Sequence, residues 1–165
     1  MKRKYWILAL GAPFWIIVDQ YTKYLIRSGF RLSETIPVIS GYFNITYVRN
    51  TGAAFGFMAN ADPSFRVPFF LTVPVIALGV ILVLIKRLPD SDVKMSTALM
   101  LVVSGAIGNL IDRAALGYVV DFLDFHWRYQ IHFPSFNVAD SVICVGVGLM
   151  MLDIINQGAA QAKEK

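Results

Sequence analysis

The sequence predicts a mainly α-helical membrane protein, a bundle of four transmembrane helices with a small extracytoplasmic β-sheet that forms a cradle over one end. The chain of 165 residues is 56% hydrophobic, with a mean hydropathy of +0.58, and a soluble domain of this length cannot bury so much apolar surface. Four apolar runs have the roughly 17–25 residues that span a bilayer. The two longer loops between them hold aromatic and β-branched segments, which favour strands.

The four predicted spans form one domain over residues 1–165. The spans are residues 5–25, 67–85, 95–111 and 138–155, and the longer connecting loops are residues 26–66 and 112–137. The first run also has the basic start and apolar continuation of a cleavable secretory signal. However, the charged segment Asp19–Lys23 stands where a small-residue cleavage site would be needed. We therefore expect the first span to be retained.

Basic residues predict the orientation of the bundle. Four spans place both termini and the connection at residues 86–94 on one side, which then carries eight of the 15 Lys and Arg residues in short segments. The other seven are spread over the longer loops and their flanks. The positive-inside rule predicts cytoplasmic termini and outward-facing loops. The net charge of +4 reflects these cytoplasmic flanks and indicates no nucleic-acid partner.

Both outward loops contain strand-like segments. Residues 42–49 are rich in aromatic and β-branched residues, and Phe43, Ile45 and Tyr47 alternate with Asn44, Thr46 and Val48. Residues 50–52 form a predicted turn and residues 53–57 a second extended piece. Residues 118–127 are apolar and β-prone with interleaved carboxylates. Open strand edges are not tolerated in lipid, so the predicted sheet lies at or above the outer interface. We expect it to form a lid or cradle there.

Two acids stand out because of where they lie. Asp140 is near the start of the fourth span, and Asp121 is in the loop that precedes it. A carboxylate at membrane depth costs about 2.5–3.5 kcal/mol, so it is rare without a function. Two carboxylates brought to one membrane face can share a proton, as acid–base hydrolysis requires. We expect Asp140 to be the ionised member, because the positive helix end favours its charge, and Asp121 the proton carrier.

Asp140 also has a purely structural interpretation. Asn137 is a favoured N-cap residue, and an acid three positions later can reach back to the cap. Other polar residues have local explanations as well. Asp124 is predicted to be a surface acid on the strand face opposite Asp121, and Asp112 is predicted to pair locally with Arg113.

Helical spacing groups further candidates. Asp19 and Lys23 are four apart and can pair within the first span, and Asn109 and Arg113 share a face of the third. The small residues Ser104, Gly105 and Gly108 allow another helix to approach the third span. The two histidines are too scattered among carboxylates for a zinc site, and the single cysteine excludes an intrachain disulfide. We expect no metal and no cofactor.

Five sequence blocks together resemble lipoprotein signal peptidases, also called signal peptidase II. They occur in this order along the spans and outer loops, and the resemblance extends over nearly the whole chain. The blocks are Asp19-Gln20-x-Thr22-Lys23, Asn50-Thr51-Gly52-Ala53-Ala54-Phe55-Gly56, residues 105–113 (GAIGNLIDR), Val119-Val120-Asp121-Phe122 and Phe136-Asn137-Val138-Ala139-Asp140. Ser104 stands where the family often has glycine.

The resemblance implies an aspartic peptidase of the bacterial inner membrane that needs no metal or organic cofactor. Its substrate would be a prolipoprotein cut just before a diacylglyceryl-modified cysteine, membrane lipid would surround it, and globomycin would inhibit it. By residue matching, Asp121 and Asp140 correspond to the catalytic dyad, and Asp19 and Lys23 to supporting positions. Positions lining the substrate site correspond to Asn50, Gly52, Asn109, Arg113, Asn137 and Ala139.

Two other classes of function remain open from the residues alone. A small proton-coupled membrane transporter also uses intramembrane acids, but it predicts acids distributed through the membrane depth. Here the acids gather toward the span ends. A non-catalytic membrane assembly module would leave the two acids without a chemical role.

Overall fold

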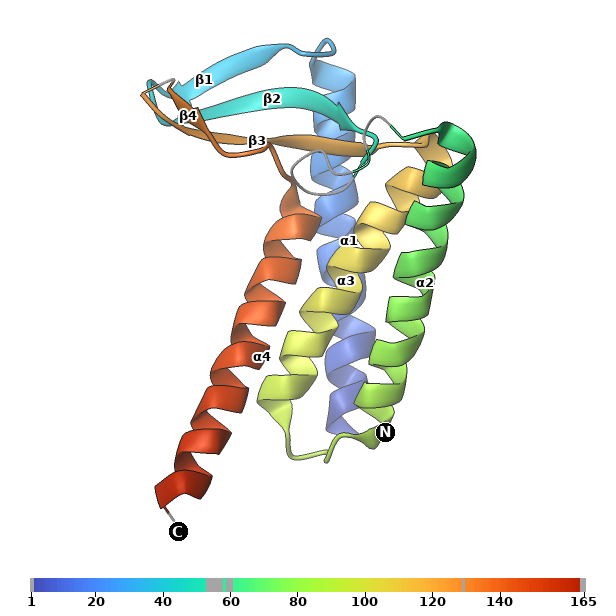
Figure 1. Ribbon diagram of the computed structural model, residues 1–165, viewed down its shortest axis with the longest axis vertical. Coiled ribbons are helices and arrows are strands. Elements are labelled where there is room, and N and C mark those ends of the chain that lie inside the picture. Colours follow the sequence, from blue (N-terminus) through green and yellow to red (C-terminus); the bar gives the residue numbers. More distant parts are fainter. Residues whose placement is uncertain (1, 53–57, 59–60, 129, 164–165) are drawn as a thin grey trace.

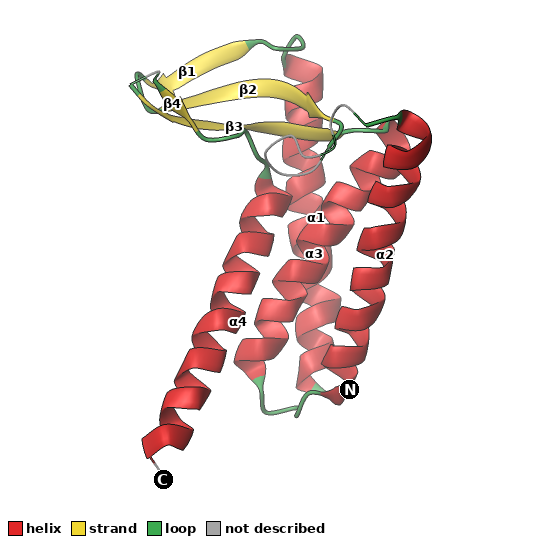
Figure 2. Cartoon of the chain, in the orientation of Figure 1, coloured by secondary structure: helices red, strands yellow, loops and turns green. Residues whose placement is uncertain are grey.

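Four long helices stand side by side, and an antiparallel sheet lies across one end of them (Figures 1 and 2). This is a computed structural model that describes residues 2–52, 58, 61–128 and 130–163. The helices are α1 (Arg3–Gly29), α2 (Pro63–Arg87), α3 (Val93–Leu116) and α4 (Val138–Lys163). The strands are β1 (Thr35–Ile39), β2 (Phe43–Asn50), β3 (Val119–Trp127) and β4 (Ile131–His132). Both chain ends lie at the end of the bundle that is remote from the sheet (Figure 1).

Three of the helices are long and apolar enough to cross a membrane, counted over the residues that the structure describes. They are α2, α3 and the segment Val138–Asn156 of α4, with hydropathies of 2.7, 1.5 and 2.1. The first predicted span also folds as a helix, but α1 carries charged residues at its start and in its second half. Each helix extends past its predicted span, because hydrophobicity marks only the lipid-facing part of a helix whereas capping residues mark its ends. Asp92, for example, accepts a 3.0 Å hydrogen bond from the backbone of Met95 at the start of α3.

The bundle is apolar outside and partly polar inside. Large side chains such as Phe14, Ile17 and Ile76 are more than half exposed, as expected for a surface that faces lipid. The central helix α3 packs against α1, α2 and α4. A Cβ atom at Gly105 would collide with the carbonyl of Ala139 in α4. The prediction that small residues let another helix approach α3 is therefore confirmed.

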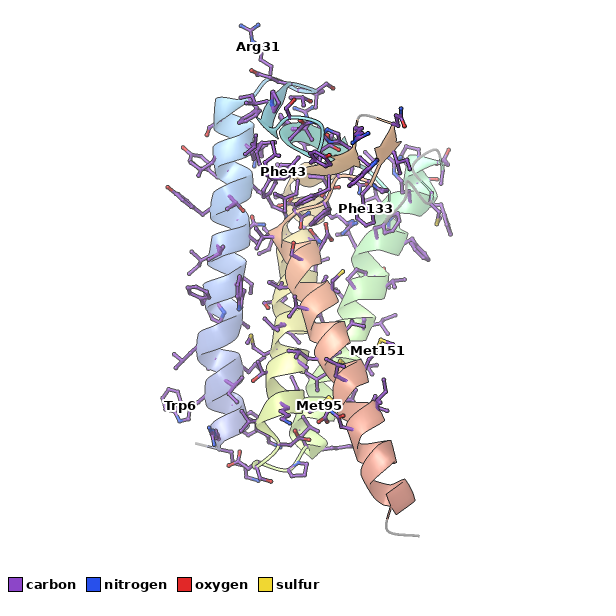
Figure 3. All side chains as sticks on the ribbon, turned by 90° about the vertical axis from the view of Figure 1, so that its left-hand side faces the viewer. Trp6, Arg31, Phe43, Met95, Phe133 and Met151 are labelled. Carbon is purple, nitrogen blue, oxygen red and sulfur yellow. The ribbon has the colours of Figure 1, made fainter. Side chains whose placement is uncertain are left out.

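The sheet has the strand order β1-β2-β3-β4, with antiparallel neighbours. The predicted strands at residues 42–49 and 118–127 are confirmed as β2 and β3. The short strands β1 and β4 were not predicted; β1 contains Pro37, which is compatible only with an edge position. The predicted extended piece at residues 53–57 lies outside the described residues. Phe43 and Phe133 belong to the sheet end of the molecule, and Met95 to the opposite end (Figure 3).

The prediction that Asp124 is a surface acid is wrong. Its register partner across β2 and β3 is Asn44, whose side-chain amide donates a 2.8 Å hydrogen bond to the Asp124 carboxylate. Both side chains are buried, as is His126 two residues along the strand. The alternation rule put Asp124 on the face opposite Asp121, but it gave no information on what covers that face.

Candidate active site

Asp121 lies in β3, where the strand passes over the end of the helix bundle. Its side chain is only 2% exposed. One carboxylate oxygen accepts a 2.7 Å hydrogen bond from the side-chain amide of Asn137, and the other accepts a 2.9 Å hydrogen bond from that of Asn50. A register shift in the β2–β3 pairing between Ile45 and Val48 sets Asp121 opposite Val48. The strand pairing thus places a buried acid beside the start of α4.

Asp140 lies in the first turn of α4 and is half-buried. Its backbone N–H donates to the side-chain oxygen of Asn137 at 2.9 Å, and its carboxylate accepts from the Asn137 backbone N–H at 3.2 Å. These reciprocal bonds confirm the predicted helix cap. The other carboxylate oxygen accepts a 2.8 Å hydrogen bond from the Asn109 amide of α3. Asp140 therefore caps its helix and also faces α3.

Asn137 joins the two acids. It is fully buried, donates its side-chain amide to Asp121, and receives the backbone N–H of Asp140 on its side-chain oxygen. Together with Asn50 of β2 and Asn109 of α3, residues from four separate parts of the chain thereby converge at one end of the bundle. The sequence prediction that the topology brings Asp121 and Asp140 to the same region agrees with this placement.

The environment of Asp121 favours its protonated form. Burial, followed by the negative charge of Asp140, raises the pKa of Asp121 to about 7. The hydrogen bonds from Asn50 and Asn137 oppose this shift, because they stabilise the carboxylate. This upward shift of the Asp121 pKa has the direction expected if Asp121 carries the proton. Which acid holds the proton in the working enzyme stays a prediction.

A buried lysine organises the layer beneath the acids. The Lys23 ammonium lies 2.9 Å from the Asp19 carboxylate, 3.2 Å from that of Asp112, and donates to the Asn109 side-chain oxygen at 3.0 Å. The predicted Asp19–Lys23 pair is confirmed. The predicted local pairing of Asp112 with Arg113 is wrong, because successive residues on a helix do not face each other. Packing of α1 on α3 supplies Lys23 instead.

The two acids bound to Lys23 each hold the backbone next to a site acid. Asp112 accepts a 2.9 Å hydrogen bond from the N–H of Val120, the residue before Asp121. Asp19 accepts a 2.8 Å hydrogen bond from the N–H of Ala139, the residue before Asp140. One buried ammonium thus supports both acids through two carboxylates.

Gln20 and Asp112 are the site residues that sequence reasoning missed. The Gln20 amide donates to the Asp112 side chain and to the Gly108 carbonyl, both at 3.0 Å. Gln20 precedes Lys23 by three positions, so helical spacing places both on one face of α1. This spacing could have identified Gln20 from the sequence. Its partner Asp112 is revealed only by the packing of α1 on α3.

Arg113 links α3 to the turn that follows β2. Its guanidinium donates a 3.1 Å hydrogen bond to the Gly52 carbonyl and lies 5.1 Å above the ring of Phe70. The Gly52 N–H donates to the Asn50 side-chain oxygen at 2.9 Å, and Asn50 in turn contacts Asp121. Asn109 and Arg113 were predicted to share a face of α3, but they contact different parts of the site. Asn109 donates to Asp140, and Arg113 donates to the turn at Gly52.

Two neighbouring acids in a buried polar site, at the end of an apolar helix bundle, are the arrangement that a membrane aspartic peptidase requires. The family model described as signal peptidase (SPase) II matches residues 12–156. The chain belongs to the signal peptidase II family. It is therefore an aspartic peptidase, and the family resemblance seen in the sequence is confirmed.

Relatives and solved structures agree with this assignment. Lipoprotein signal peptidase of Geobacter metallireducens is 45% identical over 164 residues, which cover 99% of each chain. The enzyme of the same name from Geobacter sulfurreducens is 52% identical over 147 residues, covering 89% of this chain and 90% of that one. A bacterial membrane enzyme solved by the in meso method at 2.3 Å resolution superposes with a TM-score of 0.81 at 34% identity, over 90% of this chain and 87% of that one. These comparisons do not support the proton-coupled transporter.

Proposed function

We propose that this protein removes the signal peptide from diacylglyceryl-modified bacterial prolipoproteins, with Asp121 and Asp140 as the catalytic pair. The single observation that carries the proposal is the buried Asn137, which is hydrogen-bonded to both residues. An asparagine in this position holds two acids near each other without neutralising either of them. The raised pKa of Asp121 supports division of the pair into a proton donor and a base.

The proposed reaction uses one water held between the two carboxyl groups. Ionised Asp140 accepts a proton from this water as its oxygen attacks the scissile carbonyl carbon, and protonated Asp121 gives its proton to the carbonyl oxygen. The resulting diol then collapses and the C–N bond breaks. The leaving nitrogen takes the proton from Asp140, and a diol hydroxyl returns its proton to Asp121. Both acids thus end in their starting states.

The surrounding residues have proposed roles that follow from their contacts. Asn50, Gly52 and Arg113 form a hydrogen-bonded series from Asp121 to the turn after β2, and we assign them to the substrate site. The positions of Asn109, Asn137 and Ala139, next to one or both acids, suit groups that orient the pair; Asn137 and Ala139 are fully buried. Asp19 and Lys23 support the site from beneath.

The proposed topology has four membrane crossings in a single domain of the bacterial inner membrane, with both termini in the cytoplasm and the sheet on the outer face. The Lys4 ammonium donates to the carbonyls of Lys86 and Leu88 at 2.8 and 2.6 Å, so basic segments far apart in sequence share one end. For α1, burial of the Asp19–Lys23 pair supports a crossing, because a paired charge inside the bundle does not face lipid.

This topology suits an amphiphilic substrate. The apolar signal helix and the acyl chains can stay in lipid while the scissile bond reaches carboxylates at the outer end of the bundle. Membrane lipid and the lipidated precursor are the proposed partners, and globomycin is the expected inhibitor.

Incubation of the purified protein with a synthetic precursor tests this function. The diacylglyceryl-modified precursor should be cut on the N-terminal side of its cysteine, and mass spectrometry of both products identifies the bond. The same peptide with an unmodified cysteine is the matched control and should remain uncut, as should the lipidated peptide with globomycin. Equal cleavage of both peptides would contradict the proposed substrate class.

A further inference from the structure

An apolar groove opens between α2, α3 and α4 at the end of the bundle that is remote from the sheet. Its volume is about 300 Å³. We call it the terminal groove and define it by its lining residues, which are Leu84, Arg87, Leu88, Pro89, Met95, Leu99 and Met150. Met95 is labelled at this end of the molecule in Figure 3. The groove is far from Asp121 and Asp140, so the proposed reaction does not use it.

The groove has a formed apolar wall. Leu99 is buried together with Ile85 and Val103, and Met95 and Met150 pack against this cluster. Beside it, the last turn of α2 is tied to α1, because the buried Lys4 ammonium donates to the Lys86 and Leu88 carbonyls. This end of α2 is therefore held in place on one side and open to the groove on the other.

Arg87 is the one charged residue of the lining and is exposed. The C-terminal carbonyls of α2 near it are already occupied by Lys4. Among the residues that the structure describes, no carboxylate lies within ion-pairing distance of Arg87. Its guanidinium is thus available for an external anion at the mouth of an apolar groove.

This combination fits an amphiphile with an anionic head and an apolar chain. We propose that the terminal groove binds one anionic phospholipid, whose phosphate contacts Arg87 and whose acyl chain lies against Leu99 and Met150. Basic pockets between transmembrane helices on the cytoplasmic side bind such headgroups. The charge of the site disfavours the other apolar candidate, the signal helix of a substrate, because such helices begin with a basic segment that Arg87 would repel.

A lipid at this position would hold α2 in the bundle. Among the helices, α2 packs mainly on α3, and Phe70 and Ile85 are its only buried side chains in the described chain. An acyl chain between α2 and α4 would fill space that no side chain described in the structure occupies. The same helix carries Phe70 beneath Arg113 at the other end, so the lipid would stabilise the helix that supports the turn at Gly52.

Native mass spectrometry of the delipidated, full-length protein in neutral detergent tests this proposal. Phosphatidylglycerol and phosphatidylcholine of the same chain length are titrated in parallel, and the wild-type protein should prefer phosphatidylglycerol. Arg87→Gln should weaken phosphatidylglycerol binding about fivefold, the effect of one basic residue near the membrane surface. Lys86→Gln is the matched control, since it removes the same charge one residue away from a position outside the lining, and it should bind like wild type.

A second variant tests the acyl-chain part of the site. Leu84→Trp places a larger side chain in the groove, and Leu84 is 44% exposed, so the fold tolerates the change. It should reduce binding of both lipids. Glycerol phosphate and inorganic phosphate, added in excess, should not displace the lipid, and displacement by either would assign Arg87 to a free anion instead.

Three further results would overturn the proposal. They are equal phosphatidylglycerol binding by Arg87→Gln and wild type, a loss with Lys86→Gln as large as that with Arg87→Gln, and displacement of the lipid by a signal peptide with one-to-one stoichiometry. The last result would assign the groove to the substrate. Each readout is lipid binding and not cleavage, so failure of this proposal is distinguishable from failure of the peptidase function.

Discussion

Asn137 donates its side-chain amide to Asp121 across 2.7 Å, from a position that is completely buried. The oxygen of the same amide receives the backbone N–H of Asp140. One side chain therefore fixes the spacing of both acids and also begins α4. The cap is a common local motif, whereas its contact with Asp121 requires β3 to be folded over the bundle. Assembly of the acid pair therefore requires the sheet to be in place.

The first prediction concerns pH and activity. In the proposed reaction Asp121 is the proton donor, and its pKa is raised to about 7. The rate should therefore fall as the pH rises through about 7 and Asp121 loses its proton. Asn137→Ala removes a hydrogen bond that lowers this pKa. The variant should be much slower and should keep its remaining activity to a higher pH. A pH–rate profile of both proteins measures this, and an unmoved alkaline limb in Asn137→Ala would contradict it.

The second prediction concerns pH and stability. An acid whose pKa is higher in the folded than in the unfolded state stabilises the protein fully below its unfolded pKa of 3.8, and this stabilisation is lost as the pH rises toward about 7. Asp121→Asn should therefore raise the Tm in detergent at pH 8 and raise it clearly less at pH 5, where only part of this stabilisation is lost. Thermal unfolding at the two pH values decides this. A variant that is less stable at pH 8 would show that the Asp121 carboxylate is well satisfied by its neighbours.

The third prediction concerns Lys23. Lys23→Met leaves Asp19 and Asp112 as two buried carboxylates without their shared cation, and loss of one partner from a buried ion pair costs about 3–5 kcal/mol. The variant should unfold at a clearly lower temperature or fail to accumulate. Lys94→Met removes an exposed lysine from α3 and serves as the control, with little change in Tm. Similar losses in both variants would show that the buried network contributes nothing specific.

The fourth prediction concerns the contact between α3 and α4. A side chain at Gly105 would meet the Ala139 carbonyl and Ile143, so Gly105→Ala should force the helices apart next to Asp140 and destabilise the protein by about 1–3 kcal/mol. Gly79→Ala is the matched control, because nothing lies within 4 Å of the position its Cβ would take. Activity and Tm should both fall only in the first variant. Unchanged activity of Gly105→Ala would show that the acid pair does not depend on this close approach.

Local features of the site could be predicted from sequence, because they depend on spacing along one element. The Asn137–Asp140 cap and the Asp19–Lys23 pair are three and four residues apart, and both formed as expected. The partner of Asp112 could not be predicted, since it lies on another helix at a position that only packing defines. Burial of Asp124 likewise depends on the register between β2 and β3.

The helices also show what sequence can and cannot predict. Hydropathy located all four, but α1 differs from the others because contacts with α3 and α4 bury two of its charged residues, Asp19 and Lys23. Composition alone cannot tell a charge that faces lipid from one that faces a partner. The short strands β1 and β4 have no periodicity long enough to detect, and they form because β2 and β3 offer edges to pair with.

Conversion of a diacylglyceryl-modified precursor by Asp121→Asn and Asp140→Asn proteins is the most direct test of the catalytic pair. Each substitution keeps the size of the side chain and removes its acid, so each should lower the rate by about 10⁴-fold while the protein still inserts and folds. Asp153→Asn, on the same helix as Asp140 but outside the site, should cleave at the wild-type rate. Near wild-type cleavage by a folded Asp121→Asn or Asp140→Asn protein would contradict the assignment of these two acids as the catalytic pair.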